Sequence, residues 1–158
     1  MLWADGITDD APDVENFQGV LHFKQSDLAE RYRELSPKGL VDLVVIGCPQ
    51  ASVSEARSTA AFVRSRMELG EKIQNHRLWV FMSSHNYDII GADGTLDILE
   101  EGGALVLKDT CPEVTPYNRA NYNHLLTNSL KAEHYLTSGL NKMPTSVATI
   151  EDLSLIHI

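Results

Sequence analysis

The 158-residue sequence is short of basic residues, long apolar runs and cysteine. Its 13 lysines and arginines face 22 aspartates and glutamates, so the net charge is −9. A nucleic-acid surface needs basic side chains to neutralise phosphates, and this deficit argues against such a partner. No apolar run approaches the roughly 20 residues that cross a bilayer, and the first residues lack the pattern of a signal peptide. We therefore expect a cytoplasmic protein with no membrane segment.

Cysteine occurs only at Cys48 and Cys111. Two cysteines in a cytoplasmic chain are poor support for a disulfide. The ordinary alternative is that both are small buried hydrophobic residues. The sequence also has no glycine loop of the kind that cradles phosphates. The pair Gly102-Gly103 is predicted to end a helix and is not such a loop. A nucleotide-binding motif is therefore not predicted.

Short apolar runs alternate with helical patterns along the chain. Strands are predicted at residues 19–23, 41–46, 78–82, 104–107, 124–127 and 146–150. Helices are predicted between them, starting near Ser26, Ser52, Ser83, Thr95 and Ser129. This order is typical of βα units on one sheet. The predicted fold class is α/β, a three-layer α/β/α arrangement with a mostly parallel sheet and helices on both faces.

Each cysteine follows a predicted strand and precedes a proline. In open α/β sheets, ligands collect outside the carboxyl ends of the strands, so Cys48 and Cys111 could converge on one cleft. Soft thiolates suit iron or zinc, but two ligands are too few for a closed site. The segment 111–121 is predicted to be a loop of functional length. Inert turn cysteines fit the same pattern, and the residues alone leave both readings open.

Several motifs resemble the aconitase X family. The run 42–52, Asp-Leu-Val-Val-Ile-Gly-Cys-Pro-Gln-Ala-Ser, is similar to the family's first cysteine block, except that Gln50 stands where the family usually has His. Asp109-Thr110-Cys111 resembles the second cysteine motif, and residues 127–136 resemble the Asn-Ser-x-Lys-Ala stretch. Weaker resemblances lie at residues 6–12 and 146–153, so the similarity spans roughly residues 5 to 153.

The resemblance implies an aconitase-like α/β domain that works with a swivelling small domain, fused or on a separate subunit. It implies iron held by cysteines, as a mononuclear ion or a 2Fe-2S cluster, with Cys48 and Cys111 as ligands. Family members are dehydratases, and their substrates include cis-3-hydroxy-L-proline and phosphomevalonate.

Loss of water from an alcohol needs help with the leaving hydroxide, which iron supplies as a Lewis acid. It also needs a base for the neighbouring proton, and no residue in the sequence is identified as that base. A substrate carboxylate needs cationic or hydroxyl partners, and Asn128, Ser129 and Lys131 are the local candidates. Helix capping and a solvated lysine explain the same three residues. His85 is a further possible site residue, with a surface histidine as the alternative.

We expect residues 1–153 to be part of an aconitase X catalytic domain truncated on its N-terminal side, and residues 154–158 to be a non-native tail. The predicted parent is a hydro-lyase for a small hydroxy acid, most simply cis-3-hydroxy-L-proline. The alternatives are a phosphomevalonate dehydratase large subunit and a non-catalytic α/β binding fragment. The 158 residues alone are expected to be inactive, since the other iron ligands of family members come from further upstream and have no counterpart in this sequence.

Overall fold

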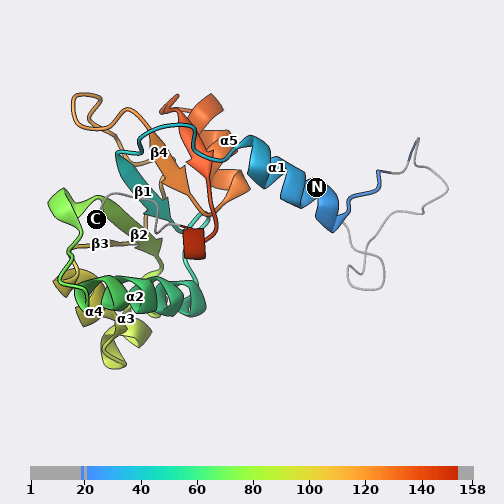
Figure 1. Ribbon diagram of the computed structural model, residues 1–158. Coiled ribbons are helices and arrows are strands. Elements are labelled where there is room, and N and C mark those ends of the chain that lie inside the picture. The colour runs from blue at the N-terminus through green and yellow to red at the C-terminus, as the bar shows by residue number, and fades with distance from the viewer. Residues whose placement is uncertain (1–18, 20, 153–158) are drawn as a thin grey trace.

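A computed structural model describes residue 19 and residues 21–152 (Figure 1). The resemblance at residues 6–12 and the predicted tail at 154–158 lie outside these described residues. Five strands form one sheet in the order β3-β2-β1-β4-β5, and all four neighbouring pairs are parallel. The strands are β1 (Leu43–Ile46), β2 (Leu78–Met82), β3 (Leu105–Lys108), β4 (Leu125–Thr127) and β5 (Thr145–Val147). The predicted parallel sheet is confirmed.

Helices cover both faces of this sheet, as the three-layer prediction requires. On one face lie α2 (Val53–Met67), α3 (Ser84–Ala92) and α4 (Thr95–Glu101), which Figure 1 shows together below the strands. The opposite face is covered by α5 (Leu130–Ser138) and by the loop between β3 and β4. A short 3₁₀ turn, Gln74–His76, precedes β2.

The central strand β1 shows how the sequence builds these layers. Val44 and Ile46 pack into the cluster formed with α2, α3 and α4, whereas Leu43 and Val45 pack into the cluster with α5. All four residues are buried, because alternate side chains of a strand point to opposite faces and both faces are covered. Full burial of each such side chain is worth roughly 1.5–3 kcal/mol.

The strand order creates a switch point between β1 and β4. The chain leaves β1 through α2 and reaches β2 on one side, and it leaves β4 through α5 and reaches β5 on the other. In such sheets the two connections diverge and leave a crevice at the carboxyl ends of the two central strands. The fold therefore places the Cys48 loop and the start of α5 at one edge.

The N-terminal predictions need correction. The expected strand at 19–23 is absent from its described residues, since Leu21 and Phe23 are 100% and 75% exposed and have no neighbouring strand. Helix α1 (Gln25–Glu34) is present, but its N-cap is Lys24 and not Ser26. Asp27 accepts from the amide of this N-cap residue, Lys24, at 2.8 Å, so the helix is capped two residues before the serine that was expected to cap it.

The other serine caps are confirmed. Ser52 caps α2 with the reciprocal Glu55 of a capping box, and Ser83 and Ser129 cap α3 and α5 by accepting from Asn86 N and Ala132 N. Each of the three serines follows a strand, directly at Ser83 and within a few residues at Ser129 and Ser52, and has the extended conformation of an N-cap.

Candidate functional site

The Cys48 loop lies between β1 and α2 and is held mainly through its backbone. Gly47 adopts a φ of +104°, and a Cβ added there would lie 2.1 Å from the Phe81 carbonyl oxygen, so only glycine fits. The Ala51 amide donates to the same Phe81 carbonyl at 2.7 Å, and the Asn86 side chain of α3 donates to the Ala51 carbonyl at 3.1 Å. Strand β2 and helix α3 thus shape the loop that presents Cys48.

The start of α5 contacts this loop from the other side of the switch point. The Ser129 hydroxyl donates to the Cys48 carbonyl at 3.1 Å and accepts from Ala132 N at 3.2 Å. The Asn128 amide donates to Glu55 Oε1 at 2.9 Å, and the Asn128 carbonyl accepts from the Tyr32 hydroxyl at 3.1 Å. The structure therefore brings the β4–α5 connection against the first cysteine loop.

The Cys111 loop follows β3 and is longer. Asp109 begins it with a positive φ of 53°, and its carboxylate accepts from the Ser84 amide of α3 at 2.8 Å. Within the loop, Thr115 donates to the Cys111 carbonyl and Tyr117 donates to the Pro112 carbonyl, each at 2.9 Å. Tyr117 also stacks on Trp79 of β2, with ring centroids 5.7 Å apart. These contacts lay the loop across the α5 side of the sheet.

Electrostatics show that the two thiols share one environment. Both cysteines are free and half-buried. Burial raises the pKa of the Cys48 thiol, the Lys131 ammonium lowers it, and nearby Cys111 and Glu113 raise it further. Partial burial likewise raises the pKa of Tyr117, with smaller contributions from Cys111, Glu113 and Cys48. Cys48 and Tyr117 pack against the same cluster as α5, and Cys111 and Glu113 lie near enough to affect the pKa of both groups.

The three predicted substrate-binding residues have different surroundings. The Ser129 hydroxyl is occupied by the cap and by the Cys48 carbonyl, as the capping alternative describes. Asn128 is committed to Glu55 through its amide nitrogen, and its buried Oδ1 has no hydrogen-bond partner among the described residues. Lys131 is exposed, and its charge reaches Cys48. Of the three, Lys131 has the side chain most available to an anion.

Two further side chains from the sequence analysis face solvent. His85 is exposed on α3, as the surface alternative describes, and Gln50 is exposed within the Cys48 loop. Sequence reasoning missed Glu113 and Tyr117, which line the thiol environment. Their signal was available, since both belong to the proline-containing loop that begins at Cys111.

Within the part of the chain that the structure describes, the two thiols have too few further donors around them for a metal site. Among residue 19 and residues 21–152, no three histidine, cysteine, aspartate or glutamate side chains form a group that could hold a metal ion. Two thiols supply soft donors suited to iron, but a closed site needs about four. The described residues therefore do not form a complete iron site by themselves.

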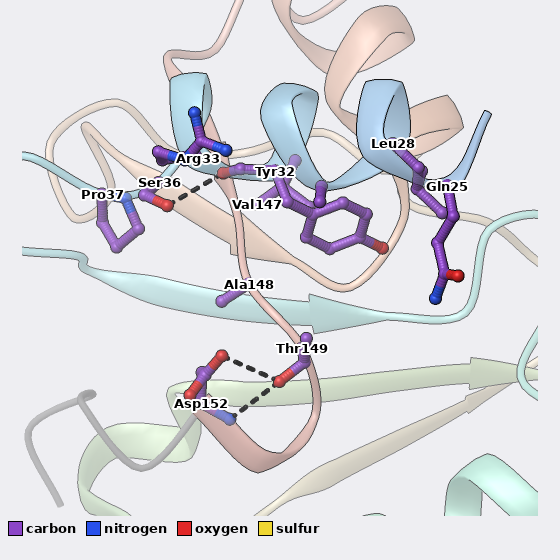
Figure 2. A pocket seen from close by; sticks show the side chains of 11 residues that line it. Gln25, Leu28, Tyr32, Arg33, Ser36, Pro37, Val147, Ala148, Thr149 and Asp152 are labelled. Atoms are coloured by element: carbon purple, nitrogen blue, oxygen red, sulfur yellow. Dashed lines mark hydrogen bonds between the residues drawn. The ribbon is translucent and has the colours of Figure 1, made fainter. Parts of the chain in front are cut away.

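A separate groove lies between α1 and the segment after β5. The groove has a volume of about 730 Å³. Figure 2 shows Leu28 and Tyr32 of α1 on one wall and Ala148 and Thr149 on the other. Neither cysteine lines this groove.

Within the described chain, no helix has the length and apolar character needed to span a membrane.

Comparison with known proteins shows the family to which this chain is similar. A family model described as "Aconitase X third domain" matches residues 41–154. The phosphomevalonate dehydratase large subunit of Methanocaldococcus jannaschii is 35% identical over 113 residues, which is 71% of this chain and 27% of that subunit. The cis-3-hydroxy-L-proline dehydratase of Pseudomonas aeruginosa is 32% identical over 152 residues, which is 85% of this chain and 24% of that enzyme.

A solved structure agrees with the sequence matches. The crystal structure of Thermococcus kodakaraensis aconitase X in its holo-form aligns with a TM-score of 0.69 and 26% identity, covering 81% of this chain and 32% of that chain. The chain thus spans about a quarter to a third of the length of these relatives. Because the family model covers most of the described residues and the aligned structure has the same fold, the chain belongs to the aconitase X family.

Proposed function

We propose that this chain is part of the catalytic domain of a dehydratase that eliminates water from a small hydroxy acid. The observation that carries the proposal is that Cys111 and the Lys131 ammonium both act on the Cys48 thiol, whose loop follows β1 at the switch point of the sheet. A pair of inert packing cysteines would not require a lysine charge at the same place. The non-catalytic binding fragment is therefore the weaker alternative.

Each of these groups has a defined task in the proposal. Cys48 and Cys111 contribute two thiolates toward an iron centre, mononuclear or 2Fe-2S, whose other ligands come from the rest of the parent protein. Such iron, when bound, supplies Lewis acidity for the departing hydroxide. Lys131 attracts the substrate carboxylate, and Ser129 and Asn128 hold the Cys48 loop in place. A swivelling small domain or subunit closes the site in this proposal.

Two substrates follow from the family. cis-3-Hydroxy-L-proline is the substrate we propose first; like phosphomevalonate, it has a carboxylate for Lys131 and a hydroxyl to be lost. Phosphomevalonate is the second candidate, and the 35% identity to the Methanocaldococcus jannaschii large subunit favours testing it. The residues of this chain do not discriminate between the two.

The test uses the full-length parent gene, expressed anaerobically with iron and with any neighbouring small subunit. Water loss from both substrates is measured, and turnover of one of them is expected. Lys131→Met should raise KM for that substrate, while Lys108→Met is the matched control, since the Lys108 ammonium lies over the Tyr87 ring of α3. A full-length protein that carries iron and converts neither substrate would refute the proposal.

The 158-residue chain provides a second arm of that test. Reconstituted with iron and sulfide, it is expected to hold little iron and to show no turnover, because metal affinity depends on ligand number and on a preformed site. Stoichiometric iron with turnover equal to that of a full-length relative would contradict the proposed incompleteness of the site.

A further inference from the structure

Glu113 connects the Cys111 loop to the far end of α5. Its Oε1 accepts from the Leu140 amide, just after the helix, at 2.6 Å. A Cβ added at Gly139 would lie 2.3 Å from that oxygen, so the absence of a side chain at 139 is what admits the carboxylate. Glu113 Oε2 is buried and has no hydrogen-bond partner among the described residues.

Further contacts fasten the same two segments together. The Asn141 side-chain amide donates to the Glu113 carbonyl. Arg119, later in the loop, donates to the carbonyls of Asn141 and Lys142, each at 2.7 Å. The loop that starts at Cys111 is therefore tied to the α5–β5 turn at more than one position.

The N-terminal end of α5 contacts the loop that carries the other cysteine, Cys48. Ser129, its N-cap, donates to the Cys48 carbonyl, and Ala132 and Leu136 are buried in the cluster that Cys48 packs against. A nine-residue α-helix has a constant length, because each residue rises about 1.5 Å along a hydrogen-bonded backbone. One rigid element thus contacts both cysteine loops, one at each end.

We propose that Glu113 is a positioning residue that, through α5, holds the Cys111 loop at a constant separation from Cys48. The inference deepens the proposed function, on which it rests for the importance of the thiol pair. Glu113 itself need not touch a substrate. Its carboxylate oxygen and the carbonyls around it set where the second thiol stands.

The test measures the separation of the thiols and not activity. The full 158-residue chain is treated with dibromobimane, which becomes fluorescent when it bridges two thiols, and with monobromobimane, which labels each thiol singly. Cys48→Ser and Cys111→Ser supply the background without a bridge. The ratio of bridged to singly labelled product reports the geometry of the pair, because such closure is sensitive to displacements of about 1 Å.

Glu113→Ala should lower this ratio by about tenfold, since intramolecular reaction depends steeply on orientation, while single labelling rises or stays equal. Glu113→Gln should retain most of the ratio, because its amide oxygen still accepts from Leu140 N. A Glu113→Ala chain that unfolds cooperatively and bridges like the unchanged chain would overturn the proposal, as would an unchanged chain that does not bridge.

Arg119→Ala covers the case in which Glu113→Ala does not fold. Arg119 is exposed, so its side chain can be removed without opening the core. The hydrogen bonds from Arg119 to the carbonyls of Asn141 and Lys142 are then lost. The ratio should fall, by less than for Glu113→Ala, and an unchanged ratio overturns the proposal. Bridging requires no dehydratase turnover, so failure of the proposed function would leave this result intact.

Discussion

The two cysteine loops are held by different means. The Cys48 loop occupies residues 47–52 and is fastened largely through backbone groups, among them the Ala51 amide on the Phe81 carbonyl. The Cys111 loop occupies residues 109–124, and side chains such as Glu113, Thr115 and Tyr117 fasten it. A short loop between fixed ends has few alternative conformations, whereas a long loop keeps its conformation only through the side chains that bind it.

This difference bears on how a two-loop site is built. At Cys48 the motif itself leaves little freedom, because Gly47 admits no side chain and Ser52 caps α2. Contacts from Phe81 and Ser129 then fix the loop. The geometry at Cys111 is set by residues that are distant in sequence, such as Leu140. Substitutions in the first loop should therefore damage folding, and substitutions in the second should mainly alter the placement of its thiol.

The largest expected effect is that of Gly47→Ala. The substitution adds left-handed strain and a clash with the Phe81 carbonyl, and should destabilise the chain by about 3 kcal/mol or more. Urea denaturation measures it. Gly70→Ala is the matched control, since Gly70 also has a positive φ of 78° but nothing within 4 Å of an added Cβ, and should cost about 1 kcal/mol. Equal losses would show that the clash is relieved.

Ser129→Ala should follow, with a loss of about 1–2 kcal/mol from the missing helix cap. It should also change the reactivity of Cys48, because the hydroxyl that anchors the Cys48 carbonyl is removed. Ser83→Ala removes an equivalent cap on α3. Denaturation together with iodoacetamide labelling separates the two roles. If both variants alter Cys48 labelling alike, Ser129 acts only as a cap.

Tyr117→Phe tests the second loop and should cost about 1 kcal/mol, the net value of one hydrogen bond. The ring still stacks on Trp79, while the bond to the Pro112 carbonyl is lost. Thermal unfolding gives the stability, and labelling of Cys111 gives the local effect. The comparison predicts a clear change in labelling beside a small change in stability. A loss as large as that of Gly47→Ala would erase the distinction between the loops.

The smallest effect concerns charge and leaves stability nearly unchanged. Burial raises the pKa of the Cys48 thiol, and the exposed Lys131 partly opposes this by favouring the thiolate. Lys131→Gln should therefore move the pH midpoint of Cys48 alkylation upward, measured in a Cys111→Ser background. High salt should reduce the difference, because exposed charges are screened. A midpoint that does not move would place the lysine charge away from the thiol.

The sequence patterns predicted the fold well where a strand is buried on both faces. The run 41–46 is predicted as a strand because it is β-branched and nearly all apolar, and β1 lies at the centre of the sheet. The same reasoning was wrong at 19–23, where apolar residues have no strand to pair with. A short apolar run predicts a strand only if the fold supplies a partner, and that is decided by residues elsewhere in the chain.

By itself, the sequence determined the parallel α/β architecture, the caps at Ser52, Ser83 and Ser129, and the positions of both cysteines after strands. These depend on periodicity and on local hydrogen bonds, which adjacent residues supply. Only the tertiary structure decided that Glu113 reaches Leu140, that Ser129 serves Cys48, and that Tyr117 lies beside both thiols. Those contacts join segments far apart in sequence, and their geometry exists only once parallel pairing has brought the carboxyl ends of β1, β3 and β4 to the same end of the sheet.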